Sequence, residues 1–122
     1  IRGEQPIIRS DGTLLRDYLY VQDAVHAYMT LAEHLDADAV RGQAFNFGMD
    51  KPTSVLEMVQ AIVAVSNRPD LEPVVLGDAP NEIPAQYMDS GKAQRLLNWA
   101  PGHSLEEGLG ETFAWYREFL SR

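Results

Sequence analysis

The stretch from Arg16 to Val25, RDYLYVQDAV, decides the fold of this chain, because an extended run passes into a helix within it. Leu19–Val21 is short and apolar, which is typical of an extended segment. Asp23 follows and can cap the first turn of a helix. Apolar residues then recur at helical spacing, at Val21, Ala24, Val25, Tyr28, Leu31, Ala32 and Leu35. The stretch predicts a helix that fades over residues 36–38 and stops at Gly42.

Two short apolar runs flank Asp11–Gly12 on the amino-terminal side of this stretch. An Asp-Gly pair between two such runs favours a β-hairpin, because a type I′ turn needs positive φ at both central positions. In that register Arg9 lies opposite Leu14, and Ile7 lies opposite Arg16. Alternation of side chains along the strands then sets Arg9 and Arg16 on the same face. A longer loop would change this register.

The rest of the chain predicts further short strands and helices. Two capping boxes, Ser54 with Glu57 and Ser104 with Glu107, predict the starts of two helices. The other predicted elements are strands at 44–47 and 73–76, a loop at 77–84 and a short helix capped by Asp89 that runs through Leu97. This pattern predicts an α/β fold with short strands, a hairpin and three main helices.

Bulk composition excludes several classes of function. The 122 residues are 45% hydrophobic and 23% charged, which suits one globular domain. A net charge of −8 argues against nucleic-acid binding, which depends on neutralising phosphates with Lys and Arg. There is no cysteine, and no apolar run approaches the ~20 residues of a membrane helix. We expect a cytoplasmic protein, and the start at Ile1 without an initiator methionine predicts a longer parent.

Several motifs, in order along the chain, resemble one family. RDYLYVQDAV at 16–25 resembles the RDY-x-YV-x-DAV segment of the extended short-chain dehydrogenase/reductases, specifically the nucleotide-sugar dehydratases and epimerases. Phe45–Gly48 resembles their FN-x-G strand. Residues 89–93, 97–101 and 104–109 are similar to their closing D-x-x-KA, LGW-x-P and SLEEGL signature. The loop at 81–87 is similar to that of the GDP-mannose and CDP-glucose 4,6-dehydratases.

The resemblance implies that residues 1–122 are the carboxy-terminal, nucleotide-sugar-binding lobe of such an enzyme, without its amino-terminal Rossmann cofactor domain. It further implies a homodimeric parent that uses NAD or NADP to act on a nucleoside-diphosphate sugar. The chain itself has no glycine-rich turn after a strand, and no tyrosine has a lysine four residues on. We therefore expect the chain alone to bind no NAD and to be inactive, with no catalytic residue of its own.

Arg16 is the first candidate for substrate binding. The resemblance implies that it contacts the pyrophosphate of the nucleotide sugar, and a guanidinium offers a planar fork of donors that suits phosphate oxygens. The alternative is a surface ion pair with Asp17 or another carboxylate. Arg9 stands where many relatives have an aromatic residue against the base, and its plane can stack there instead. Its alternative is a solvated strand arginine.

Asn81 and Glu82 are the second pair of candidates. Many relatives carry an arginine in the corresponding loop as a second pyrophosphate contact, and Ala79 takes that position here. Asn81 and Glu82 can instead bind ribose hydroxyls, since a carboxylate accepts hydrogen bonds from two of them readily. The alternative is a plain polar loop.

The other polar and aromatic residues have structural interpretations. Asn46 and Gly48 close a strand, and Trp99 is interpreted as a core aromatic at a turn. The three histidines show no metal-ligand spacing, so no metal site is predicted.

Three functions remain open. The first is the substrate lobe of a dehydratase or epimerase, the second a free-standing nucleotide-sugar-binding module, and the third part of a reductase with another substrate. The paired arginines argue against the third, and the coding sequence upstream of Ile1 would separate the first two.

Overall fold

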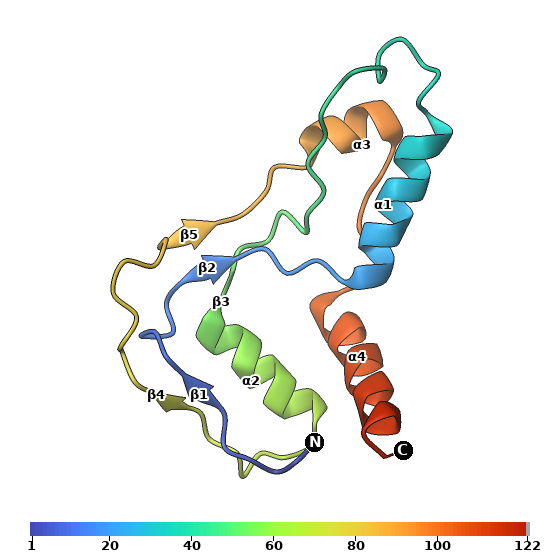
Figure 1. Ribbon diagram of the computed structural model, residues 1–122. Coiled ribbons are helices and arrows are strands. Elements are labelled where there is room, and N and C mark those ends of the chain that lie inside the picture. Colours follow the sequence, from blue (N-terminus) through green and yellow to red (C-terminus); the bar gives the residue numbers. More distant parts are fainter. Residues whose placement is uncertain (122) are drawn as a thin grey trace.

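Four helices and five two-residue strands alternate along residues 1–121, which are the residues that the computed structural model describes. In order they are β1 (Ile7–Ile8), β2 (Leu15–Arg16), α1 (Val21–Glu33), β3 (Thr53–Ser54), α2 (Val55–Val65), β4 (Val74–Val75), β5 (Ala85–Gln86), α3 (Gly91–Leu97) and α4 (Leu105–Phe119) (Figure 1). The α/β class with short strands and three main helices is confirmed.

The predicted hairpin is wrong, because β1 and β2 belong to different sheets. β1 pairs in parallel with β4, with Ile7 opposite Val74. Of the two turn residues only Gly12 has a positive φ, +85°. Asp11 Oδ1 instead accepts from the amide and the hydroxyl of Thr13, at 2.9 and 2.8 Å. The loop is therefore held by hydrogen bonds between its own residues, and the two strands that it joins pair with other strands.

β2 is the central strand of a three-stranded sheet in the order β3-β2-β5. It runs antiparallel to β3 and parallel to β5, so that Arg16 lies opposite Thr53 on one side and Gln86 on the other. The sequence did not predict β5, whose Ala-Gln pair has no strand signal of its own. The pairing brings residues about 70 positions apart beside Arg16.

Both capping boxes are confirmed. Ser54 Oγ accepts from Glu57 N at 3.2 Å, and Glu57 Oε2 accepts from Ser54 N at 2.8 Å. Ser104 and Glu107 repeat the same two bonds at the start of α4. α2 and α4 pack against each other (Figure 1). Two local motifs thus set the starts of the two helices that form this part of the fold.

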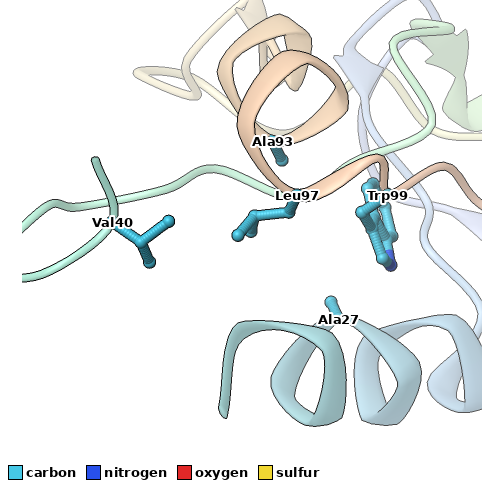
Figure 2. Close-up of a cluster of buried hydrophobic side chains, with 5 residues drawn as sticks. All are labelled: Ala27, Val40, Ala93, Leu97 and Trp99. Atoms are coloured by element: carbon cyan, nitrogen blue, oxygen red, sulfur yellow. The ribbon is translucent and has the colours of Figure 1, made fainter. Parts of the chain in front are cut away.

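The buried core lies between α1, α3 and the segment after α1. Its five residues are Ala27, Val40, Ala93, Leu97 and Trp99. Figure 2 shows Ala27 on α1 facing Leu97 and Trp99. Trp99 is 1% exposed and meets Phe47 edge to face at 4.9 Å, so its interpretation as a core aromatic is confirmed.

The apolar face of α1 is largely exposed. Val21, Val25 and Tyr28 are 65%, 58% and 76% exposed, while Asp23, Ala27 and Thr30 are buried. Nor does Asp23 cap the helix, since the N-cap is Tyr20 and no side chain bonds there. Helical spacing identifies the apolar face of a helix, but residues elsewhere decide which face is covered. Here the small side chain of Ala27 lets the α3 region pack on the opposite face.

The prediction of a strand at 44–47 is wrong, because these residues form no strand in the part of the chain that the structure describes. The phenylalanines of this segment pack on the core instead. Lys92 Nζ lies 4.8 Å from the centre of the Phe45 ring and donates to Ala44 O at 2.9 Å. At α3 the N-cap residue is Ser90, whose side chain makes no capping bond to the helix, and Asp89 Oδ1 accepts from Gly91 N at 2.8 Å. Asp89 therefore accepts from the first amide of this helix, but it is the residue before the N-cap and not the N-cap itself.

Candidate functional site

The loop between β4 and β5, residues 77–84, is the feature around which the candidate residues gather. Its first residues are held by the end of β1, because Asp78 N donates to Arg9 O at 2.6 Å. Its last residues are held by β2, because Leu15 N donates to Pro84 O at 2.9 Å. Arg9 and Arg16 therefore stand at opposite ends of the same loop. The hairpin that set them on one face is absent, and the two sheets bring them to this loop instead.

Arg16 is anchored at the end of the loop. Its Nη1 donates to Leu15 O at 2.7 Å and to Ile83 O at 2.9 Å. Its Nη2 lies 3.4 Å from Glu82 Oε2. The arginine side chain is 24% exposed and the glutamate 49%, so this ion pair is a weak one that an anionic ligand can displace. The expected alternative of an ion pair is present, but with Glu82 rather than Asp17.

Arg9 is exposed at the end of β1. Its side chain makes no hydrogen bond or ion pair within residues 1–121, whereas its backbone carbonyl holds the loop. This matches the environment of a solvated arginine and leaves the guanidinium plane accessible. The geometry is thus compatible with either of the interpretations that the sequence left open.

Asn81 and Glu82 line a hollow of about 350 Å³ between this loop and residues 10–14. Asn81 has φ +70°, a left-handed conformation that turns the chain at this point. Asp11 and Asp78 also line the hollow, and neither arginine does. Three carboxylates make it a poor place for a phosphate but a suitable one for hydroxyl groups, which donate to carboxylate oxygens.

A pair that sequence reasoning missed joins α1 to the turn before α4. Asp23 Oδ1 lies 2.9 Å from His103 Nδ1, and the carboxylate also accepts from Gly102 N at 2.9 Å and His103 N at 3.2 Å. Burial raises the pKa of Asp23, but the hydrogen bonds from His103 and Gly102 outweigh it and hold the pKa below its usual value. The hydrogen bond to Asp23 raises the pKa of His103. No local pattern in the sequence identifies this pair, because its two residues lie 80 positions apart.

A second contact fastens the same two helices. Tyr20 Oη donates to Glu111 Oε2 at 3.0 Å, and Gln22 Nε2 donates to the same oxygen at 3.2 Å. Burial, and then the hydrogen bond to Glu111, raise the pKa of Tyr20. Gly108 packs so closely on the Tyr20 ring that a Cβ there would lie 3.0 Å from it. The RDYLYVQDAV stretch thus carries one candidate binding residue, Arg16, and several that hold α4.

A second hollow, of about 750 Å³, lies between the first turn of α1, α2 and α4. Its lining is mostly apolar, with Met58, Ile62, Leu109 and Trp115 among its walls. Among residues 1–121 no lysine or arginine lines it, so the described lining offers no cationic complement to a phosphate.

Over residues 1–121, no three His, Cys, Asp or Glu side chains gather in an arrangement that would hold a metal ion. None of the helices described there has both the length and the apolar character to cross a membrane.

Comparison with known proteins gives one consistent result. Residues 1–48 match the NAD dependent epimerase/dehydratase family. UDP-glucose 4-epimerase of Cyamopsis tetragonoloba is 32% identical over 106 residues, which cover 87% of this chain and 30% of that protein. The enzyme of the same name from Halalkalibacterium halodurans is 34% identical over 112 residues, covering 88% of this chain and 32% of that protein. The chain thus spans about a third of the length of these curated relatives.

Solved structures agree with the sequence comparison. UDP-glucose 4-epimerase of Thermotoga maritima with UDP-glucose superposes with a TM-score of 0.81 at 32% identity, covering 98% of this chain and 37% of that one. The epimerase of Stenotrophomonas maltophila with NAD and formylated UDP-arabinopyranose gives 0.84 at 26% identity, with coverages of 96% and 36%. dTDP-glucose 4,6-dehydratase of Bacillus anthracis with NAD gives 0.75 at 24% identity, with coverages of 95% and 35%, and shares the fold. The resemblance that the motifs indicated is confirmed.

Proposed function

Because this chain is related to the NAD dependent epimerases and dehydratases of nucleotide sugars, we propose that it is the carboxy-terminal, nucleotide-sugar-binding lobe of an epimerase. The observation that carries the proposal is Arg16, which the RDY motif places on the central strand of a sheet whose edge loop holds Asn81 and Glu82. A cationic fork beside hydroxyl-accepting groups suits a pyrophosphate next to a ribose.

Epimerisation is favoured over dehydration by the relatives themselves. The curated proteins above, at 32% and 34% identity, are UDP-glucose 4-epimerases. The dehydratase neighbour is 24% identical and supports the fold alone. We therefore propose a UDP-hexose as the substrate, and we do not retain the dehydratase-like interpretation of the loop at 81–87.

In this proposal Arg16 changes partner when the substrate binds. The guanidinium leaves the weak contact with Glu82 for the two phosphates, whose charge attracts it more strongly than a half-exposed carboxylate does. Glu82 is then available, with Asn81, to accept from the ribose hydroxyls at the hollow beside the loop. Arg9, free at the other end of the loop, contacts the base.

We assign the redox chemistry to a part of the parent that this chain does not cover. None of its strand-to-helix connections carries a glycine-rich turn, so these residues do not fit the diphosphate of NAD. NAD or NADP supplies hydride transfer at the sugar when bound elsewhere in the parent. Residues 1–122 contribute binding and orientation of the nucleotide sugar.

The test is to assay the full-length protein with UDP-glucose and NAD for formation of the C4 epimer, and to titrate it with UDP. The proposal expects turnover and saturable UDP binding. It expects residues 1–122 alone to bind no NAD at millimolar concentration and to show no turnover. A full-length protein that neither binds UDP nor interconverts UDP-hexoses would overturn the proposal.

A further inference from the structure

The sheet that carries Arg16 is too small to fix its own geometry. Each of the strands β3, β2 and β5 has two residues. The two ladders, of two residue pairs each, leave the flanking segments free to shift unless other contacts hold them. The placing of Glu82 and Ile83 against the Arg16 guanidinium must therefore depend on bonds beyond the strands.

Asp17, the residue that follows β2, supplies those bonds on both sides. Its Oδ1 accepts from Met49 N at 2.9 Å, in the segment that leads into β3. Its Oδ2 accepts from Met88 N at 3.3 Å, in the segment that leaves β5. One carboxylate thus joins both edges of the sheet, and a charged acceptor makes such bonds stronger than a neutral one.

The Asp17 carboxylate packs closely against Gly48. Gly48 is buried against it, and a Cβ on Gly48 would overlap Asp17 Oδ2 and come within 2.9 Å of Met88 Cβ. Gly48 N also donates to Ser90 Oγ at 2.7 Å, which ties the same two segments together a second time. The sequence interpretation of Gly48 as structural thus gains a reason, which is that a side chain there would displace Asp17.

We infer that Asp17 is a positioning residue for the Arg16 site, and that it acts on nucleoside-diphosphate binding without touching the ligand. Residues 84–88 are held at one end by Leu15 N on Pro84 O and at the other by Asp17 on Met88 N. Ile83, directly before this segment, presents its carbonyl to Arg16. Loss of the Asp17 anchor lets the loop carrying Glu82 move away from the guanidinium. The ligand named here rests on the proposed function.

The first experiment compares Asp17→Asn with the wild type in the full-length protein, using UDP as the probe. The amide keeps the size of the carboxylate but turns a donor toward one of the two backbone N–H groups. UDP binding is expected to weaken roughly ten-fold, as for the loss of one hydrogen bond to a charged group, and NAD binding is expected to stay the same. Asp70→Asn is the matched control, since Asp70 is exposed and pairs with Arg68 in a separate turn. Equal UDP affinity for Asp17→Asn and the wild type would overturn the inference.

A double mutant separates positioning from general destabilisation. If Asp17 acts through Arg16, then Asp17→Asn should weaken UDP binding by much less in an Arg16→Ala background than in the wild type. An equal fold-loss in both backgrounds would mean that Asp17 does not act through Arg16. Gly48→Ala disturbs the same carboxylate from the other side, and it should reproduce the loss with Asp17 intact.

Hydrogen exchange tests whether Asp17 anchors the segments at Met49 and Met88, even if the protein binds no UDP. In Asp17→Asn the amides of Met49, Met88 and Leu15 should exchange faster, while the Ser104 capping-box amide, which lies outside this sheet, keeps its rate. Unchanged exchange at Met49 and Met88 would overturn the inference. Faster exchange there, in a protein whose wild type does not bind UDP, would support the anchor and refute the proposed function instead.

Discussion

His103 Nδ1 lies 2.9 Å from Asp23 Oδ1 across 80 positions of sequence, and the pair joins the first turn of α1 to the turn before α4. The Asp23 side chain is 3% exposed and that of His103 is 27% exposed. The Tyr20 ring lies edge-on to the imidazole at 4.9 Å. The bonds of Tyr20 and Gln22 to Glu111 join the same two parts of the chain a second time.

The pair makes stability depend on pH in a defined direction. The hydrogen bond to Asp23 raises the pKa of His103 above its usual 6.5, and nearby Glu111 and Glu107 add to this shift. The contribution of His103 to folding stability is therefore complete below pH 6.5 and is lost as the pH rises through the raised pKa. The pKa of Asp23 is held below 3.8, so its contribution is present above that pH and lost in stronger acid. Stabilisation by the pair should therefore be greatest between about pH 4 and 6.5. Urea unfolding from pH 4 to 9 should show that the stability advantage of wild type over His103→Gln shrinks above pH 6.5. A pH-independent difference would contradict this.

Replacing Asp23 should lower the free energy of unfolding more than replacing its partner His103. Asp23→Ala leaves the backbone N–H groups of Gly102 and His103 without their acceptor. Both bonds are only part-buried, so each orphaned donor should cost less than the upper end of the about 1–3 kcal/mol typical of a buried one, and the expected loss in the free energy of unfolding is about 2–4 kcal/mol. His103→Ala keeps both backbone bonds and should lose less. Asp36→Ala removes an exposed carboxylate after α1 and serves as the control. Urea midpoints that rank His103→Ala below Asp23→Ala in stability would refute the assignment.

The exposed face of α1 should make the isolated chain associate with itself. Val21, Val25, Tyr28 and Met29 are each more than half exposed on this helix, and apolar patches of this kind favour association. Val25→Lys should lower the apparent mass in light scattering of residues 1–122. Gln60→Lys adds the same charge at an exposed site on α2 and should leave the mass unchanged. A monomer at high concentration in the wild type would count against the prediction.

Elements set by local chemistry could be predicted from the sequence, whereas those set by distant partners could not. Ser54 with Glu57 marks a helix start within four residues, and the box formed as predicted. The strand partners of Ile7 and Arg16 lie about 70 residues further along the chain, and no local pattern identifies them. Asp11–Gly12 has the sequence of a hairpin turn, but the pairing of β1 with β4 overrides it.

In the candidate site, too, local sequence identifies individual residues but does not show which of them lie together. The motif identified Arg16, and the loop composition identified Asn81 and Glu82, so three neighbouring residues could be named in advance. Their neighbourhood arises from the β2 and β5 pairing, which the sequence did not predict. Asp23 was interpreted as a helix cap because aspartate is common at that position. Its burial against His103 depends on the close approach of the turn at Gly102, which no helical periodicity can reveal.

The last prediction concerns the two arginines, which should act on substrate affinity separately. In the full-length protein Arg16→Ala should remove a bidentate contact worth about 1.5–3 kcal/mol and weaken UDP binding roughly ten- to a hundred-fold. Arg16→Lys should recover part of the loss, because a point charge does not reproduce the fork. Arg9→Ala should cost less, and Arg9→Phe should be tolerated better than Arg9→Ala if the residue stacks on the base.

Because Arg9 and Arg16 lie on different sheets and hold opposite ends of the loop at 77–84, their losses should add in the double mutant to within about 0.5 kcal/mol. NAD affinity should not change in either variant, since the proposed function assigns cofactor binding to another part of the parent. Titration of the single and double variants with UDP and, separately, with NAD measures these affinities. Undiminished UDP affinity in Arg16→Ala would refute the site, and equal losses for both ligands would show a folding defect rather than a lost contact. A strongly non-additive double mutant would mean that the two guanidinium groups meet on one phosphate after all, by a movement of the loop that joins β4 to β5.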